Sequence, residues 1–382
     1  MSDHKTKNST VALRIVCAIL FFLFTFVYLH FYQADVLAAA QHVLSDGQTH
    51  YVKNVGTVII IVALYLLHLL VLGITRLTKS AHALTYFPSF LVLAFLTNFN
   101  LHATRGYSLL SWALVAAVLL IIYVGVVWLA RQMQKYDNDP KTHYGLFSRA
   151  MWKNLLTMVV MMFVVGLVGN SNDVFHHRMS VEKALVDNQM EKALMVGKKS
   201  LANDSSLTAL RILALSKSGL LGERLFEYPV KGGSSAMIPD QKTCRFVMLS
   251  EDSLYRHLGA RPRHRMSSMG FLKLIHQIHM AKKPAHDYLL CAYLLDKRVD
   301  DFAREIGNYY KTDSVIPKHY REALILHNHI RSHPVVEYRD NVLDADYKDY
   351  LKLTREKASK RERKTKVRDT YGNTYWYYYE FE

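Results

Sequence analysis

This sequence of 382 residues lacks the short signatures by which many enzymes are recognised. It contains no glycine-rich phosphate-binding loop, no HExxH zinc-protease motif, no CxxC pair and no G-x-S-x-G nucleophile elbow. Many active sites are assembled from distant residues, so these absences argue against an enzyme without excluding one. The sequence names no substrate or reaction, and we expect no cofactor.

Cysteine is scarce, with three residues in the whole chain: Cys17, Cys244 and Cys291. Cys17 lies inside an apolar segment. Cys244 and Cys291 both lie in the second half of the chain, where an oxidising compartment would allow a disulfide. Their spacing does not show whether they meet, so a disulfide and two free thiols are both open.

Charge is scarce in the first part of the chain. Residues 1–170 carry 12 Lys and Arg and 5 Asp and Glu, whereas residues 171–382 carry 36 and 27. We therefore predict a transmembrane domain over 1–170 and a soluble domain over 171–368. Part of the net charge of +16 is attributed to contacts with lipid headgroups and to the positive-inside bias. No nucleic-acid-binding motif is present, so no nucleic-acid partner is expected.

Five apolar segments are long enough to cross a bilayer, which needs about 20 residues. In lipid each must be a helix, because only a helix satisfies its own backbone hydrogen bonds. The third is the weakest, because it contains a proline, two asparagines and a histidine, and a re-entrant or interfacial segment is its alternative. The predicted spans are residues 11–31, 55–75, 84–104, 108–130 and 152–170.

The distribution of positive charge predicts the topology. With five spans, ten Lys and Arg fall on one side of the membrane, and Lys53 and Arg105 fall on the other. The richer side should be cytoplasmic, which places the N-terminus inside and the soluble domain outside. The ten residues are Lys5, Lys7, Arg14, Arg76, Lys79, Arg131, Lys135, Lys141, Arg149 and Lys153.

The first span has a signal peptide as its alternative. Its charged start and the "AAA" at 38–40 resemble a cleavable signal. Its apolar core is longer than that of most signal peptides, so we expect a retained helix. Cleavage would not change the side on which the soluble domain lies.

The second half of the sequence is amphipathic with a helical period. Residues 187–229 and 286–310 each have the pattern of a helix-turn-helix pair, with Ala193, Leu194 and Leu201 on one face of the first. Asp204 is a helix N-cap signal, and Gly219 ends the following helix. Further helices are expected over 317–330 and about 344–366. We predict an all-α protein whose soluble domain is tetratricopeptide-like, with a small irregular helical bundle as the alternative.

Two sets of polar residues are weak candidates for chemistry. His327, His329 and His333 in "HNHIRSH" have metal-like spacing, although Pro334 tends to end the helix and no carboxylate lies within the cluster. His68 lies inside the second span, where an ionisable group is a functional hypothesis by default. Hydrogen bonding of a neutral imidazole to a neighbouring helix is the expectation for His68, and no metal is expected.

Asp35 is the one catalytic candidate. It lies in "FYQADVLAAAQHVLSDGQTHY" (31–51), the first outer loop, which reads as an amphipathic helix. Multipass glycosyltransferases that use lipid-linked sugars place an essential acid in this loop, and Asp35 is similarly positioned. Those enzymes generally have more spans than five. The alternative role for Asp35 is the N-cap of an interfacial helix.

The segment 369–382 contains "YGNTYWYYYEFE" and follows a strongly basic stretch. Three interpretations compete: packing on the helical domain, insertion at the membrane interface, and docking of a partner. Alternation in an extended strand would place its tyrosines on one side. The candidate interface residues are Tyr371, Tyr375, Trp376, Tyr377 and Tyr379.

Several phrases together resemble a known family: "FYQADVLAAAQHVLSDGQTHY", "HALTYFP", "LTALRILALSKSGLLGERLFEYP" and "YGNTYWYYY". It is a family of uncharacterised multipass inner-membrane proteins of Bacteroidales, classed as a domain of unknown function. The resemblance implies a Gram-negative inner membrane, so that the outer side is the periplasm. It brings no activity and no catalytic residues.

Together these observations predict a membrane-anchored scaffold or binding module, rather than an enzyme, that contacts membrane lipids and a periplasmic protein partner. The alternative is a membrane-embedded enzyme or accessory that acts on lipid-linked glycan through Asp35.

Overall fold

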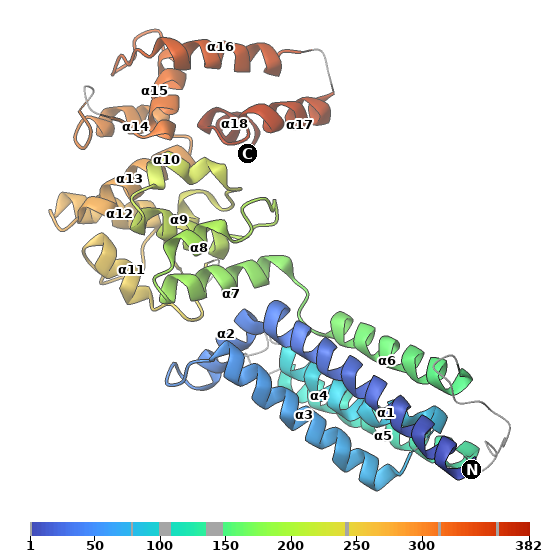
Figure 1. The fold of residues 1–382 in the computed structure, drawn as a ribbon. Helices are drawn as coiled ribbons and strands as arrows, with labels where there is room; N and C mark the ends of the chain where they lie inside the picture. Colours follow the sequence, from blue (N-terminus) through green and yellow to red (C-terminus); the bar gives the residue numbers. More distant parts are fainter. Residues whose placement is uncertain are drawn as a thin grey trace. The chain divides into compact units, whose positions relative to one another are not determined.

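The structure is a computed structural model that describes residues 2–77, 79–98, 108–134, 148–240, 244–311, 315–356 and 359–382. Over these residues all regular elements are helices, and no strand is present (Figure 1). The chain divides into two compact units, Met1–Asn172 and Asp173–Glu382, here called the membrane unit and unit 2. The all-α prediction is confirmed.

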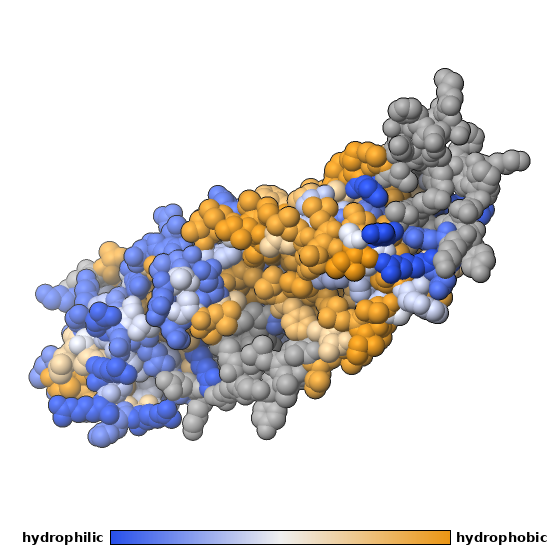
Figure 2. Space-filling view, turned by 90° about the horizontal axis from the view of Figure 1, so that it is seen from below, coloured by the Kyte–Doolittle hydropathy of each residue, from blue (hydrophilic) through white to orange (hydrophobic). Residues whose placement is uncertain are grey.

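Four helices of the membrane unit, among its described residues, are long and apolar enough to cross a membrane. They are α1 (Ser2–Val27, continued by a π-helical turn over Tyr28–Tyr32), α3 (Lys53–Thr75), α5 (Ser108–Gln134) and α6 (Arg149–Val168). Apolar side chains cover much of their outer face (Figure 2). An outward apolar face is the arrangement expected of helices surrounded by lipid.

The expected third span, 84–104, is not a fifth long helix. The segment forms a 3₁₀ helix, η2 (Lys79–Tyr86), and then an α-helix of 11 residues, α4 (Phe87–Thr97). Pro88 at the start of α4 has no N–H and its ring crowds the preceding turn, so one regular α-helix cannot run through it. Residues 99–107, which include the rest of that expected span and Arg105, lie outside the described residues.

The η2–α4 segment nevertheless runs along the length of α6. At its start the Ala83 N–H donates to Asn154 Oδ1 at 2.6 Å, near the first turns of α6. At its end the Thr97 carbonyl accepts from the Asn170 N–H at 3.0 Å, just beyond α6. The Thr97 hydroxyl also lies 3.2 Å from the Tyr28 hydroxyl at the end of α1. Segments α1, η2–α4 and α6 therefore run in one direction.

Helices α3 and α5 run in the opposite direction. The Ser89 hydroxyl donates to the Leu64 carbonyl at 2.7 Å. The Arg131 guanidinium donates through Nε to the Thr75 carbonyl at 2.8 Å, which brings the carboxyl ends of α3 and α5 together. The five segments therefore alternate in direction along the chain.

His68 bonds to a neighbouring segment, as expected. Its Nδ1 lies 3.1 Å from the Thr85 hydroxyl of η2, and its ring stacks on Tyr86 with centroids 3.6 Å apart. A polar side chain between apolar helices needs such a partner, because no water is available to replace it. The hydrogen bond to Thr85 and the stacking on Tyr86 thus give His68 a structural role.

Unit 2 is a stack of short helices around two central ones. Eleven consecutive residues of α9, Ser206–Ser216, are buried, as is most of α13. Helices α7, α8, α10, α11, α12 and α14 pack against this pair (Figure 1). Helix α15 packs on α10 and α14, α16 and α18 pack on α15, and α17 packs on α16 and α18. In chain order the helices are α7 (Asp173–Val186), α8 (Met190–Met195), α9 (Ser205–Lys217), α10 (Leu221–Arg224), α11 (Glu251–Leu258), α12 (Ser268–Gln277), α13 (Lys283–Leu295), α14 (Val299–Ile306), α15 (Lys318–Ile330), α16 (Asn341–Thr354), α17 (Lys360–Tyr371) and α18 (Tyr375–Phe381).

The predicted ends of α9 are confirmed, whereas the predicted tetratricopeptide-like repeat is not shown. Asp204 caps α9 by accepting from the Leu207 N–H at 2.7 Å, and Gly219 follows α9 with a positive φ of 68°. Leu201 was expected to pack beside Leu194, but it lies outside any helix and is 65% exposed. Helices α8 and α10 have only 6 and 4 residues, so a regular tetratricopeptide array is not shown. The single helix expected over 344–366 is two helices, α16 and α17.

Candidate functional site

Asp35 lies in the first turn of α2 (Ala34–Leu44), and the N-cap position belongs to Gln33. Asp35 lies two positions after the N-cap, so the capping role expected for it is wrong. A carboxylate in the first turn is still favourable, because it faces the positive end of the helix dipole. Gln33 fastens this corner, since its Nε2 donates to the Tyr28 hydroxyl at 3.2 Å and to the Asn170 carbonyl at 3.0 Å.

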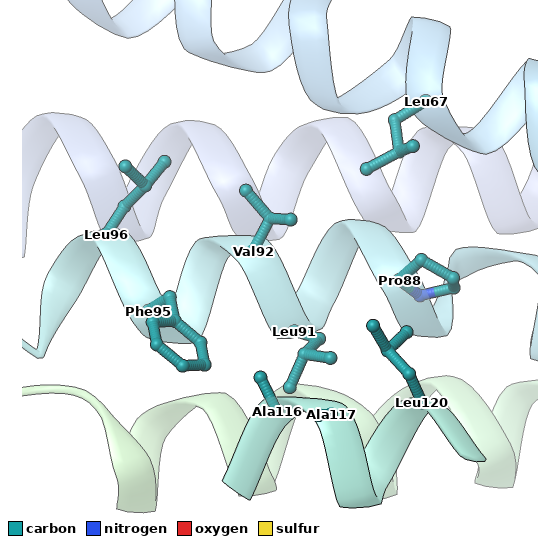
Figure 3. A pocket seen from close by; sticks show the side chains of 9 residues that line it. All are labelled: Leu67, Pro88, Leu91, Val92, Phe95, Leu96, Ala116, Ala117 and Leu120. Atoms are coloured by element: carbon teal, nitrogen blue, oxygen red, sulfur yellow. The ribbon is translucent and has the colours of Figure 1, made fainter. Parts of the chain in front are cut away.

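An apolar groove of about 590 Å³ lies between α3, α4 and α5 (Figure 3). Val92, Leu96 and Leu120 on its wall are each about two-fifths exposed on the outer surface of the helices. The groove has no side chain that could act as an acid, base or nucleophile, and its lining fits a hydrocarbon chain. Its lining residues are Leu67, Pro88, Leu91, Val92, Phe95, Leu96, Ala116, Ala117 and Leu120.

The three histidines proposed as weak metal ligands are not brought together. Helix α15 ends at Ile330, so His333 lies beyond the helix that carries His327 and His329. His329 Nε2 lies 2.6 Å from Asp344 Oδ1 on α16, and His327 is buried. Within the described ranges, no group of three or more His, Cys, Asp or Glu side chains is placed to hold a metal ion.

The aromatic segment is the helix α18 rather than a strand. Tyr375, Trp376, Tyr377 and Tyr378 are at most 8% exposed and belong to the core of unit 2, whereas Tyr371 and Tyr379 are half-buried. The predicted alternation of an extended chain is therefore wrong. Of the three interpretations, packing on the helical unit is the one whose contacts are present. Contact of these residues with a partner or with the membrane interface stays a prediction.

A buried carboxylate on α15 connects this helix to the core. Glu322 Oε2 accepts from the Tyr375 N–H at 2.7 Å and from His319 Nδ1 at 2.9 Å. The Glu322 carbonyl accepts from the Trp376 indole at 2.8 Å. His319 Nε2 accepts from the Phe226 N–H at 3.2 Å, so its proton lies on Nδ1, facing Glu322. The fold thus joins α18 to α15 and to the segment before Tyr228.

The phrase "LGERLFEYP" also has a structural explanation. A Cβ on Gly222 would lie 2.6 Å from the Tyr320 ring, so a larger residue cannot occupy this position without moving α15. Glu223 Oε2 accepts from the Lys318 N–H at 2.7 Å and so satisfies the start of α15. Phe226 packs against the rings of His319 and Tyr378. No local pattern in the sequence indicates these contacts, because they join residues that are 93 or more positions apart.

A second buried carboxylate, Glu182 on α7, holds the loop before α11. Its Oε1 accepts from the N–H groups of Val247, Met248 and Leu249 at 2.6, 2.7 and 2.8 Å. Burial raises the pKa of Glu182, and the three backbone donors oppose that rise. This side chain has a structural role, and it was not predicted from the sequence.

Cys244 and Cys291 are both buried free thiols, so the disulfide alternative is not realised. Cys291 Sγ lies 3.5 Å from the Tyr320 hydroxyl, which donates to Asp287 Oδ1 at 2.9 Å. Burial raises the pKa of Cys244 to about 12, and thiols in such surroundings are inert rather than nucleophilic.

Unit 2 has a cleft of about 460 Å³, here called the α11–α12 cleft. Its walls come from three segments: 234–240, α11 with the loop 261–267, and the start of α12. Tyr255 and Phe271 form an edge-to-face pair in its lining, with ring centroids 5.5 Å apart. The cleft is lined by Ser234, Ser235, Ile238, Pro239, Asp240, Glu251, Tyr255, Arg261, Pro262, Arg263, His264, Arg265, Met266, Ser267, Ser268 and Phe271.

The lining of the α11–α12 cleft is half apolar and half polar, with three arginines on one loop. Arg261 pairs with Asp252 at 2.8 Å, and Arg263 and His264 are exposed. Ser267 caps α12 by accepting from the Gly270 N–H at 3.1 Å. This combination of aromatic surface, guanidinium groups and hydroxyls is typical of a binding site, and it contains no arrangement of nucleophile and base.

Comparison with known proteins supports part of the expected resemblance. Residues 263–382 match the model of a family described as a family of unknown function, DUF6057. This range begins in the cleft loop and includes α12 to α18, whereas "LGERLFEYP" precedes it. No curated protein and no solved structure matches the chain.

Proposed function

We propose that this protein is a membrane-anchored binding module that presents unit 2 on the non-cytoplasmic side and binds an exported polypeptide there. The observation that carries the binding role is the α11–α12 cleft, a hollow with a mixed lining on an all-helical unit. In a Gram-negative cell this side is the periplasm of the inner membrane. The alternative enzyme role depends on Asp35, whose place in the first turn of α2 already supplies a structural role.

The proposed topology rests on the alternating direction of the five segments. The cationic residues Arg76, Arg131, Arg149 and Lys153 lie at or near one end, where α3 and α5 finish and α6 begins. By the positive-inside bias that end is cytoplasmic. With this topology the η2–α4 segment makes the third crossing, although its apolar helix is short. The segment extends along α6 from Asn154, near the start of that helix, to Asn170, just beyond its end. Helix α6 then leads outward to unit 2.

A reporter fused after Glu382 tests this topology. An enzyme that is active only in the cytoplasm is expected to be silent there, and one that is active only after export is expected to work. The same reporters inserted after Gln134, at the end of α5, should give the opposite result. Strong cytoplasmic activity after Glu382 would contradict the topology.

Site-specific photo-crosslinking in cells tests the binding role. A photoreactive residue in place of Met266, which lines the cleft and is 41% exposed, is expected to capture a defined protein partner. Val342 on α16 is 73% exposed and lies outside the cleft, so it is the matched control. Capture should be lost when Arg263 is also changed to Glu, because the cleft then loses a guanidinium that can bind the polypeptide and gains a negative charge. Equal capture from Met266 and Val342 would overturn the proposal.

A further inference from the structure

A second hollow of unit 2, independent of the α11–α12 cleft, has the features of an anion site. It has a volume of about 200 Å³ and is here called the α14–α15 pocket. Four segments form it: the turn between α13 and α14, α14 itself, the end of α15, and α18. Its lining residues are Lys297, Arg298, Val299, Asp300, Asp301, Arg304, His327, Ile330, Arg331 and Tyr379. All of them fall in the range that matches the family of unknown function.

Positive charge exceeds negative charge in this lining. Asp300 is paired with Arg331, whose Nε and Nη2 lie 2.9 and 2.5 Å from its two oxygens. Asp301 is shared by Arg298 and Arg304, at 2.6 and 3.2 Å.

Lys297 lines the pocket together with the three arginines, so four cations face the two carboxylates. Lys297 has no carboxylate partner among the described residues, and its ammonium lies 5.8 Å from the centre of the Tyr378 ring. The pocket thus has a net charge of about +2 when the imidazole of His327 is neutral.

His327 supplies the buried polar group of the pocket. Its side chain is 1% exposed, and neither ring nitrogen has a hydrogen-bond partner in the described part of the chain. Nε2 lies 3.4 Å from Asp300 Oδ1 without forming a hydrogen bond. Burial lowers the pKa of His327, so the ring is neutral at pH 7 and has one N–H to donate. A buried donor without a partner is costly, and a bound ligand oxygen would satisfy it.

We propose that the α14–α15 pocket binds the dianionic phosphate group of a phosphomonoester. A dianion balances the net charge of +2, and guanidinium groups match the geometry of phosphate oxygens. The Tyr379 hydroxyl and the His327 imidazole add neutral hydrogen-bonding groups to the lining. The volume leaves room for a small substituent beside the phosphate.

Calorimetric titration of the full chain in neutral detergent, at constant ionic strength, tests the proposal. Inorganic phosphate at pH 8 and glycerol phosphate are the soluble probes, phosphatidic acid in mixed micelles of the same detergent is the lipid probe, and chloride is the monoanion control. Saturable binding of a soluble phosphate probe assigns the site to small molecules, and binding of phosphatidic acid alone assigns it to a lipid headgroup. Both results support the phosphate site, whereas equal binding of chloride overturns it.

Substitutions assign the binding to this pocket. The double variant Lys297→Met and Arg304→Met keeps all contacts of Asp300 and should bind phosphate about tenfold or more weakly, because two charge-assisted contacts are lost. Lys192→Met, which removes an exposed charge on α8, is the control and should leave the affinity unchanged. Circular dichroism verifies that both variants are folded. The proposal is overturned if wild type shows no saturable binding, or if Lys192→Met weakens binding as much as the double variant.

Discussion

Removal of residues 374–382 is expected to unfold unit 2. The deletion takes away four aromatic side chains of the core, Tyr375 to Tyr378, and the Tyr378 hydroxyl bond to the Leu295 carbonyl at 2.8 Å. Truncating one buried aromatic side chain costs about 3–5 kcal/mol. The summed cost of losing four such side chains is as large as the whole free energy of unfolding of a typical domain, about 5–15 kcal/mol.

Thermal unfolding and limited proteolysis of the full chain in detergent measure this effect. Deletion of Glu382 alone is the control, because it leaves α18 complete and removes no buried side chain. It takes away the exposed ion pair with Lys364 at 3.0 Å, the contact of the Tyr377 hydroxyl at 3.4 Å and one backbone hydrogen bond to Tyr378. The control should unfold within a few degrees of wild type. A deleted chain whose unit 2 resists protease as wild type does would show that α18 is not part of the core, and would favour the membrane-interface interpretation of the aromatic segment.

Replacement of Glu182 by Ala is expected to lower the free energy of unfolding of unit 2 by about 3–5 kcal/mol, because three backbone donors lose their acceptor in a buried site. The donors are the N–H groups of Val247, Met248 and Leu249. Glu182→Gln keeps an oxygen at the same place, so it should cost much less. Denaturant unfolding gives the size of the loss.

Hydrogen exchange locates the same effect. The three amides at 247–249 should lose protection in the Ala variant and retain most of it in the Gln variant. If both variants unfold like wild type and the three amides remain protected, the carboxylate does not hold this loop.

Sequence patterns predicted the features that depend on neighbouring residues. Long apolar runs predicted α1, α3, α5 and α6, because in lipid the backbone has no alternative to a helix. Asp204 and Gly219 marked the two ends of α9, because capping and a positive φ involve only a few adjacent residues. Pro88 weakens the prediction of a span over the third segment, but the 3₁₀ helix that replaces its first part has no local signal in the sequence.

Features that depend on contacts between distant residues were not predictable in this way. Alternating tyrosines fit a strand as well as a buried helix. The helix α18 is held by contacts with distant residues, among them the hydrogen bond to Glu322 and the packing of Tyr375 on the ring of Phe226. The α14–α15 pocket joins a turn, two helix segments and Tyr379, whose proximity has no local signal. The spacing of His327, His329 and His333 suggested a metal, but helix α15 ends before the third of them.

The position of α18 in the core has a consequence for biogenesis. Its rings pack on Phe226 and its backbone bonds to α15, so segments about 150 residues apart in the chain must meet before the core closes. A nascent chain in which only α7 to α15 have been synthesised therefore remains an open, unfinished assembly. Folding of unit 2 is completed only after residue 381 has been synthesised, and on the proposed topology this keeps the polypeptide compatible with passage through a translocation channel until then.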